Sequence, residues 1–351
     1  MKAAFLTGIR EIEIRDAPEP VLRRPEDVMV RIDAVGVCGS DIHYYAEGRI
    51  GSQVVRFPEV IGHECSGTVA AAGSAAGKLK IGQRVAIDPL LACGECDQCI
   101  AGRPHTCRRQ KFLGCPGQAT GALAEYLVMP AQCCYPVPAS MSAAQAAMVE
   151  PLAVALHSLR LAPLNPGTRI AILGAGPIGL SVLLACRATQ KDLESRVYVT
   201  DLIDDRVEAA RQCGADWWGN PSHKDIRAAI GAHEPLGLDV VFECAGQQET
   251  LDQAAALLKP GGTLLIVGIP ELDRVSFDPH LLRRHELEVK SVRRQNNCVA
   301  PAIELIASGA VSVDPLVTHR FPLAETKSAF DLVASYGGGV IKAIIEVTPN
   351  Q

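Results

Sequence analysis

The stretch RIAILGAGPIG, residues 169–179, decides the fold of the central part of the chain. Its apolar start has the length and residue types of a buried strand. The three glycines that follow permit a tight turn, a close approach to a pyrophosphate and close packing of a helix on the strand. A helix is expected from Pro177 to Ala188, since proline suits a first helical turn. Five residues are therefore predicted to bind a dinucleotide: Gly174, Gly176, Pro177, Ile178 and Gly179.

Apolar runs after this stretch alternate with helical patterns. Short, continuous apolar strands that alternate with helices are typical of a parallel sheet covered on both faces. The predicted strands are Arg169 to Leu173, Arg196 to Thr200, Leu238 to Glu243, Thr263 to Val267 and Leu287 to Val292. The sequence thus predicts an α/β fold with a doubly wound parallel sheet.

Asp201 follows the second predicted strand, about 20 residues after the last glycine of the turn. A carboxylate at this place can accept hydrogen bonds from the ribose hydroxyls of NAD and would repel the 2′-phosphate of NADP. The pattern favours NAD, although Arg206 leaves some room for NADP. The alternative is that Asp201 only caps the helix expected around Arg206 to Gln212.

The flanking parts of the chain have a different pattern. Residues 1 to about 150 contain short β-type runs separated by Gly and Pro, such as Asp27 to Val35 and Gly67 to Ala72. After residue 293 we expect two helices and a last strand: Ala300 to Ser308, Ala324 to Ala334 and Lys342 to Val347. A nucleotide domain, residues 154–293, is therefore expected inside a β-rich domain formed by residues 1–153 and 294–351.

Four cysteines lie within 15 residues of one another: Cys93, Cys96, Cys99 and Cys107. Four thiolates can close a tetrahedral shell around Zn²⁺ and leave no position for a substrate, so the cluster predicts a structural zinc site. The alternative, four free thiols in one surface loop, would be an oxidation liability.

A second, more dispersed set consists of Cys38, His63, Glu64 and Glu150. A thiolate, an imidazole and carboxylates suit zinc and can leave a coordination position open for catalysis. If Cys38 and Glu64 both bind, their charges balance that of the metal, which would still lower the pKa of a bound alcohol. The remaining cysteines show no ligand spacing and are interpreted as packing residues.

Composition limits the class of partner. A length of 351 residues with 48 % apolar and 21 % charged residues is typical of a globular protein with two domains. The net charge of −5 argues against nucleic-acid or anionic-membrane partners, which normally require basic patches. Because no charge-free segment approaches a membrane helix and no signal sequence is visible, we expect a cytoplasmic protein.

The whole pattern resembles the zinc-dependent medium-chain dehydrogenases, and within them the sorbitol (polyol) dehydrogenase branch. The resemblance covers nearly the full length. It rests on residues 36–45 (GVCGSDIHYY), 48–51 (GRIG), 62–64 (GHE), 149–152 (VEPL), 174–179 and 317–323 (VTHRFPL). It implies a GroES-like catalytic domain, split in sequence by a Rossmann domain, with the catalytic zinc in the cleft between them.

The resemblance also implies roles for single residues. Cys38, His63 and Glu64 become zinc ligands, Glu150 a water-bridged or exchanging residue, and Ser40 and His43 a proton relay. Further NAD contacts are expected from Val267, Gly268, Ile269, Val292 and Arg293, and substrate contacts from Tyr44, Phe112, Glu150, Arg294 and Gln295. Two features depart from animal sorbitol dehydrogenases, which have tyrosine where this chain has Gln295 and lack the four-cysteine cluster.

The expected function is a zinc-dependent transfer of hydride from a secondary hydroxyl of a polyol to NAD, giving a ketose. Glu150 favours this branch, because liver-type alcohol dehydrogenases place a second cysteine there. One alternative is an L-threonine or other secondary-alcohol dehydrogenase of the same family. Another is a catalytically silent nucleotide-binding protein. The family also implies a homotetramer.

Overall fold

The computed structural model describes residues 1–189 and 194–348, and the chain forms two compact units. Unit 1 comprises Met1–Glu150 and Val299–Gln351, whereas unit 2 comprises Pro151–Cys298. The sequence places these divisions after residues 153 and 293. The observed first division, after Glu150, falls within helix α4 (Val149–Leu161). The sequence analysis did not predict this helix.

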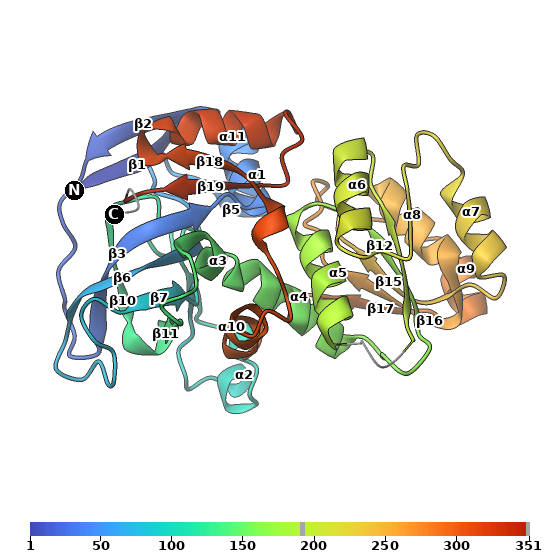
Figure 1. Ribbon diagram of the computed structural model, residues 1–351, viewed down its shortest axis with the longest axis horizontal. Coiled ribbons are helices and arrows are strands. Elements are labelled where there is room, and N and C mark those ends of the chain that lie inside the picture. Colours follow the sequence, from blue (N-terminus) through green and yellow to red (C-terminus); the bar gives the residue numbers. More distant parts are fainter. Residues whose placement is uncertain (190–193, 349–351) are drawn as a thin grey trace. The chain divides into compact units, whose positions relative to one another are not determined.

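A seven-stranded mixed sheet forms the centre of unit 1 (Figure 1). Its order is β11 (Cys134–Pro136), β7 (Arg84–Ile87), β6 (Glu64–Ala72), β3 (Asp27–Gly36), β19 (Lys342–Glu346) and β18 (Val317–Pro322), and β10 (Tyr126–Pro130) also pairs with β3. Strand β19 is antiparallel to β3 and parallel to β18. A strand from after the inserted unit therefore lies next to one from before it.

Three small two-stranded sheets and five helices complete unit 1. The small sheets pair β1 (Lys2–Gly8) with β2 (Glu11–Asp16), β4 (Arg49–Ile50) with β5 (Gln53–Val54), and β8 (Leu90–Leu91) with β9 (Lys111–Phe112). The helices are α1 (Gly39–Glu47), α2 (Asp97–Ile100), α3 (Ala143–Ala147), α10 (Val299–Ala307) and α11 (Thr326–Ala334). The buried rings of Tyr45 and Phe330 pack edge to face, 5.3 Å apart, and join α1 to α11 in the core.

Unit 2 contains a six-stranded sheet in which every pair of neighbours is parallel. Its order is β14 (Trp217–Gly219), β13 (Arg196–Thr200), β12 (Arg169–Leu173), β15 (Leu238–Glu243), β16 (Leu258–Ile266) and β17 (Glu288–Ser291). The described helices of this unit are most of α4 (Val149–Leu161), and α5 (Pro177–Thr189), α6 (Asp204–Gln212), α7 (Ile226–His233), α8 (Gln248–Leu257) and α9 (Pro279–His285). The predicted α/β fold with a doubly wound parallel sheet inside a β-rich domain is confirmed.

The order of the sheet places a switch point between β12 and β15. From β12 the chain runs outward through β13 and β14, and it then returns to β15 on the other side of β12. In open α/β sheets, ligands bind at the carboxyl ends of the strands where the order reverses. The turns after β12 and β15 are therefore the expected place for a dinucleotide.

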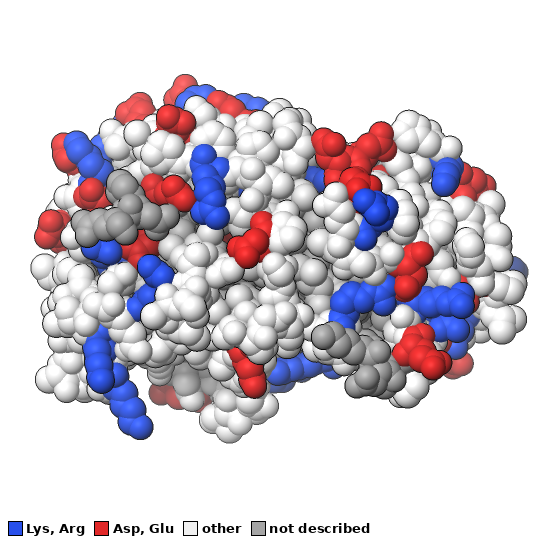
Figure 2. All heavy atoms as spheres, viewed as in Figure 1, with Lys and Arg blue, Asp and Glu red and all other residues white. Residues whose placement is uncertain are grey.

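None of the helices in residues 1–189 and 194–348 is long and apolar enough to cross a membrane. On the face shown in Figure 2, basic side chains are interspersed with acidic ones. No continuous basic patch of the kind that nucleic acids require is visible on this face.

Candidate active site

The start of helix α1 positions Cys38. This residue has an extended backbone and is the N-cap of the helix, so its side chain lies beside the first helical turn. Its N–H donates to Asp41 Oδ2 at 3.2 Å, and the hydroxyl of Ser40 donates to its Sγ at 3.3 Å. A hydroxyl donor of this kind stabilises a thiolate, which is the form of cysteine that binds metals.

The entry to strand β6 supplies the two other ligands of the group. His63 and Glu64 are buried, and one ligand atom from each lies within 4.8 Å of the other and of Cys38 Sγ. The structure thus brings together three of the residues that the sequence singled out. Their chemistry, one sulfur, one imidazole nitrogen and one carboxylate oxygen, matches the donors that zinc accepts.

Asp41 is a member of this site that the sequence analysis missed. Its Oδ1 is buried and lies 3.4 Å from His63 Nδ1, the arrangement that orients a metal-binding imidazole. Burial lowers the pKa of His63, but the Asp41 carboxylate and the Cys38 thiolate outweigh it and raise that pKa well above its usual value. The group therefore attracts positive charge. Its position three residues after Cys38, at the third residue of the helix, was the available signal.

Lys342, the first residue of β19, is the second member that sequence reasoning missed. Its Nζ lies 2.6 and 2.9 Å from the two oxygens of Glu64 and 3.0 Å from the Val37 carbonyl oxygen. Both side chains are almost fully buried, at 1 % and 2 % exposure. Burial lowers the pKa of Lys342, but Glu64 and Cys38 outweigh that effect and raise it. Glu64 is therefore already paired with a cation.

Glu150 is buried but lies outside the three-residue group. Burial raises its pKa to about 7, and the nearby Glu64 carboxylate adds to this, whereas His63 opposes it. A carboxyl with a pKa near neutrality can hold or release a proton at physiological pH. Direct binding of Glu150 to the metal stays a prediction.

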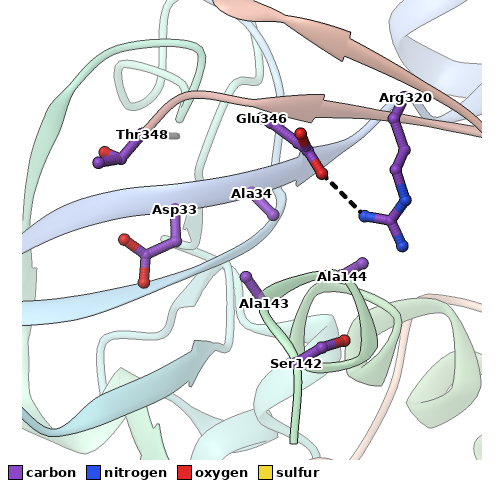
Figure 3. Close-up of a pocket in the computed structure, with 8 residues that line it drawn as sticks. All are labelled: Asp33, Ala34, Ser142, Ala143, Ala144, Arg320, Glu346 and Thr348. Carbon is purple, nitrogen blue, oxygen red and sulfur yellow. Dashed lines mark hydrogen bonds and ion pairs between the residues drawn. The ribbon is translucent and has the colours of Figure 1, made fainter. Parts of the chain in front are cut away.

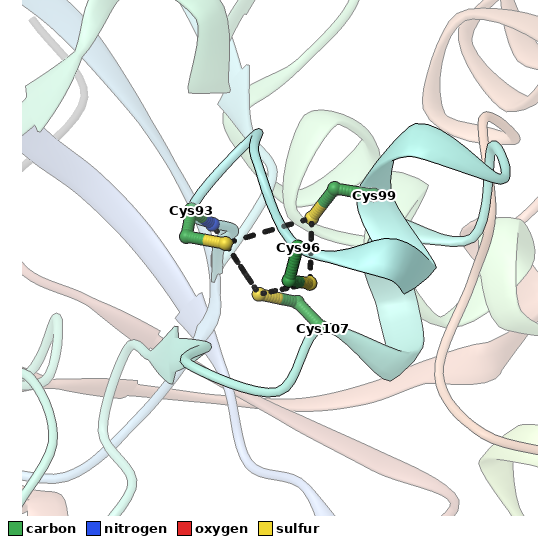
Figure 4. Close-up of side chains that lie close together, drawn as sticks. All are labelled: Cys93, Cys96, Cys99 and Cys107. Atoms are coloured by element: carbon green, nitrogen blue, oxygen red, sulfur yellow. Dashed lines mark hydrogen bonds between the residues drawn. The ribbon is translucent and has the colours of Figure 1, made fainter.

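The four-cysteine cluster is formed by the loop that contains α2, and Figure 4 shows its sulfur atoms turned toward one another. The Sγ–Sγ distances are 3.4 Å for Cys93–Cys107, 3.6 Å for Cys96–Cys99, 3.8 Å for Cys96–Cys107 and 3.9 Å for Cys93–Cys99. A tetrahedron of sulfurs about 2.3 Å from a central zinc has edges of about 3.8 Å. The four thiols therefore fit one zinc ion and leave no position for a substrate.

Local donors favour the thiolate form of two of these cysteines, Cys93 and Cys96, whereas burial raises the pKa of Cys99 to about 12. Backbone N–H groups, that of Glu95 first, lower the pKa of Cys93 to about 6. The Arg108 N–H lowers that of Cys96. The guanidinium of Arg109 lies 3.7 Å from Cys93 Sγ and also pairs with Glu95. These donors offset the negative charge that four thiolates would carry.

The turn after β12 has the packing that its glycines predict. A Cβ on Gly179 would collide with the carbonyl oxygen of Gly174, and one on Gly174 would lie 2.9 Å from the Ala245 nitrogen. Gly174 also has a φ of 100°, a backbone conformation that favours glycine. Helix α5 therefore starts close against the strand, with its N-terminal N–H groups facing the phosphate position that such turns offer.

Asp201 is tied to this turn. Its Oδ2 accepts the N–H of Ala175 at 2.7 Å, and its Oδ1 accepts that of Ile203 at 2.9 Å. Helix α6 has Ile203 as its N-cap and no side-chain cap, so Asp201 does not cap that helix. The buried guanidinium of Arg206 lies 3.6 Å from the point where a Cβ on Gly176 would stand, so it lies over the same turn.

The other predicted contact residues are divided between the units. In unit 1, the ring of Phe112 lies 5.3 Å from that of His63, and the hydroxyl of Tyr44 lies 3.2 Å from Gln53 Oε1 and 3.4 Å from Cys115 Sγ. In unit 2, Gln295 accepts the Cys298 N–H at 2.8 Å. Arg294 has a φ of 53°, while Val267 and Gly268 donate to the Glu243 carbonyl oxygen at 2.8 and 2.9 Å. Neither Gln53 nor Cys115 was singled out as a site residue from the sequence.

Comparisons with known proteins agree with this geometry. The profile described as "Alcohol dehydrogenase GroES-like domain" matches residues 24–139, and that described as "Zinc-binding dehydrogenase" matches residues 177–308. The chain is 36 % identical over 352 residues to a sorbitol dehydrogenase of Bacillus subtilis (strain 168), covering 100 % of this chain and 98 % of that protein. The chain belongs to the zinc-dependent medium-chain dehydrogenases.

Two further comparisons bear on the branch of the family and on the cofactor. An L-idonate 5-dehydrogenase of Vitis vinifera is 36 % identical over 353 residues, which are 98 % of this chain and 94 % of that protein. The crystal structure of a zinc-binding dehydrogenase from Sinorhizobium meliloti 1021 bound to NADP has a TM-score of 0.89 and 31 % identity, covering 99 % of each chain. The predicted family, enzyme class and cofactor classes, zinc and a nicotinamide dinucleotide, are confirmed.

A separate pocket of this dehydrogenase lies in unit 1 (Figure 3). It has a volume of about 280 Å³ and is lined by Asp33, Ala34, Ser142, Ala143, Ala144, Arg320, Glu346 and Thr348. Arg320 and Glu346 form an ion pair across it at 3.0 Å. The lining contains none of the residues that the sequence analysis assigned to the metal, cofactor or substrate sites, so the pocket is distinct from the candidate active site.

Proposed function

We propose that this dehydrogenase oxidises a secondary hydroxyl of a small polyol to a ketone, with NAD as hydride acceptor. The observation that carries the proposal is the group of half-buried Cys38 with buried His63 and Glu64, and with Asp41 behind the imidazole. This group attracts positive charge, and its sulfur, nitrogen and oxygen donors suit a catalytic zinc. The four-thiol cluster instead suits a structural zinc with a closed coordination shell. The names of the relatives, sorbitol dehydrogenase and L-idonate 5-dehydrogenase, support a polyol as substrate.

A zinc ion held by Cys38, His63 and Glu64 would supply the Lewis acid that lowers the pKa of the substrate hydroxyl. The protein's part is to orient the donors. Asp41 keeps a proton on His63 Nδ1, so the other ring nitrogen presents its lone pair. Lys342 holds Glu64 by both oxygens, which makes Glu64 a weaker, exchangeable donor than Cys38.

The proton of the substrate hydroxyl needs a path to solvent. Ser40 and His43 are three residues apart on α1, so they lie on one face of the helix. His43 is half-buried, and its Nδ1 lies 3.8 Å from the Glu47 carboxylate at the end of the same helix. We assign Ser40, His43 and Glu47, in this order, as the outward path: the Ser40 hydroxyl accepts the substrate proton as it gives its own proton to the His43 ring, and His43 releases a proton to solvent beside Glu47.

Unit 2 provides the cofactor site. NAD would accept the carbon-bound hydrogen of the substrate as hydride. The turn 174–179 offers backbone N–H groups to its pyrophosphate, and the Asp201 carboxylate beside this turn favours a ribose hydroxyl over a 2′-phosphate. Arg206 lies at the same turn and is the group that could accept NADP, the dinucleotide bound in the Sinorhizobium meliloti structure.

The experiment is to mix the purified protein with NAD and a panel of alcohols, and to follow NADH absorbance with and without a zinc chelator. The panel contains sorbitol, xylitol, ribitol, galactitol, L-idonate, L-threonine and 2-butanol. Chelator-sensitive NADH formation with a polyol is the expected result. Preference for L-threonine or 2-butanol would move the enzyme to the alternative substrate class, and silence across the panel with bound zinc and NAD would favour a nucleotide-binding protein.

Variants test the assignment of the metal group. Cys38→Ser and His63→Ala are expected to abolish turnover while NADH still binds, because the dinucleotide residues belong to unit 2. The matched control is Cys213→Ser, which changes another half-buried cysteine and should leave turnover near the wild-type level. Loss of NADH binding together with turnover would refute this division of labour.

The surroundings of the enzyme are also proposed. All thirteen cysteines, which lie in the described residues, are free, and free thiols persist in a reducing compartment such as the cytoplasm. The family resemblance implies a homotetramer. Light scattering of the purified protein would test the tetramer directly.

A further inference from the structure

Glu243 is a buried carboxylate at the carboxyl end of β15, the strand that borders the switch point of the unit 2 sheet. Its exposure is 0 %, which is rare for an acidic side chain without a cationic partner. The sequence analysis assigned it no role. Its contacts nevertheless all involve the turns that face the expected dinucleotide position.

The side chain holds the turn that follows its own strand. Glu243 Oε1 accepts the N–H groups of Ala245 and Gly246 at 2.8 and 2.7 Å, and the hydroxyl of Thr250 at 2.7 Å. Three donors on one buried carboxylate oxygen fix the backbone of residues 244–246 and the start of helix α8. Charge-assisted hydrogen bonds of this kind are stronger than those between neutral groups.

The same residue holds the turn after the neighbouring strand, β16. The Glu243 carbonyl oxygen accepts the N–H groups of Val267 and Gly268. The second carboxylate oxygen, Oε2, lies 2.9 Å from the point where a Cβ on Gly268 would stand, so the side chain packs directly against that glycine. The turn of residues 267–269 therefore contacts both the carbonyl oxygen and the side chain of Glu243.

Oε2 has no hydrogen-bond partner among residues 1–189 and 194–348, although it is buried. An unsatisfied buried carboxylate oxygen is unfavourable for stability, and a fold retains it where the group has another task. The turn of residues 174–179 packs against the backbone that follows Glu243, because a Cβ on Gly174 would lie 3.0 Å from the carbonyl carbon of Cys244. The Glu243 carboxylate thus contacts the turns after β15 and β16, and the turn after β12 packs against the first of these two turns.

We propose that Glu243 is a positioning residue for the dinucleotide, since it fixes two of the three turns that form the cofactor site. It acts through the backbone of residues 244–246 and 267–269. The inference rests on the proposed function only in that NAD(H) is the ligand. It predicts that loss of the carboxylate weakens NAD(H) binding and leaves the metal group in unit 1 unchanged.

The test compares Glu243→Leu with Asp239→Leu. Asp239 is an acidic residue of the same strand but at its other end, where it accepts the Arg169 N–H at 2.6 Å and pairs with Lys259. NADH affinity is measured by fluorescence titration, with zinc content and the melting temperature of the ligand-free protein recorded in parallel. Glu243→Leu should raise the Kd for NADH about tenfold or more, whereas Asp239→Leu should leave it within about twofold, at equal zinc content.

Two more variants keep the test decisive. Glu243→Gln retains an oxygen that can accept the same three donors, so its Kd for NADH should stay within about threefold of the wild type. Gly268→Ala places a methyl group against Glu243 Oε2, disturbs the contact between this carboxylate and the turn of residues 267–269, and should weaken NADH binding. A wild-type Kd in Glu243→Leu, or in Gly268→Ala should the leucine variant not fold, overturns the inference. Failure of the wild-type protein to bind NADH would remove the proposed function as well.

Discussion

Replacement of Lys342 by methionine tests the buried ion pair behind the candidate metal site. Lys342 and Glu64 are 1 % and 2 % exposed, and Nζ lies 2.6 Å from Oε2. Removing one partner of a buried pair leaves an uncompensated charge and costs about 3–5 kcal/mol. For a folding unit of 150–250 residues, that cost lowers the melting temperature by roughly 6–20 °C. The measurement uses chelator-treated protein, so that zinc does not replace the lost cation at Glu64.

The control is a second lysine–carboxylate ion pair with the same N–O distance but with exposed side chains. Lys327 and Asp331 also approach to 2.6 Å, but their side chains are 51 % and 45 % exposed. Lys327→Met should therefore cost about 1 kcal/mol or less. Thermal unfolding followed by circular dichroism compares the two variants, and Glu64→Gln added to Lys342→Met should recover part of the loss. Equal decreases in Lys342→Met and Lys327→Met would refute the argument that burial makes this pair important.

Three further predictions concern other parts of the enzyme. Cys96→Ser opens the four-thiol shell, so zinc measured by mass spectrometry should fall by one ion per chain, and an unchanged zinc content would contradict a structural site. Asp201→Gly removes the charge that disfavours a 2′-phosphate, so the ratio of kcat/KM for NAD to that for NADP should fall about tenfold or more, and a constant ratio would exclude Asp201 from this role. Burial raises the pKa of Glu150 to about 7, above the value of a free carboxyl, so ionisation of Glu150 destabilises the folded metal-free protein as pH rises from about 4.5 to 7. The melting temperature of Glu150→Gln minus that of the wild type should therefore increase between pH 5 and pH 7.5. A difference in melting temperature that does not depend on pH would contradict the raised pKa of Glu150.

The sheet of unit 2 could be predicted from sequence because its strands are buried on both faces. Strands β12, β13 and β15 have the predicted bounds, since a strand covered on both sides is a continuous apolar run between polar residues. The short edge strand β14 (Trp217–Gly219) was missed. Three residues carry too little periodicity to distinguish a strand from a turn.

The ligand candidates could be predicted from residue type, but their partners could not. Lys342 and Glu243 are charged residues with nothing unusual in their local sequence, and only the spacing of Asp41 from Cys38 gave a local signal. Lys342 reaches Glu64 because β3 pairs with both β6 and β19, and Gly36 is the register partner of Glu64 on one side and Ile344 on the other. Such a contact depends on strand order across hundreds of residues, which a single sequence does not state.

The place of β19 has a consequence for synthesis on the ribosome. Unit 2 is complete at residue 298, but residues 34–36 of β3 have no partner on the side away from β6 until β19, residues 342–346, has been added; on that side β10 pairs only with residues 27–31. At 5–20 residues per second, the nascent catalytic unit waits roughly 2–10 s with an open sheet edge after the inserted domain can fold. An unpaired edge is a template for association with other chains. The early part of this enzyme therefore depends on chaperones, or on rapid translation of its last strands, more than the domain that it encloses.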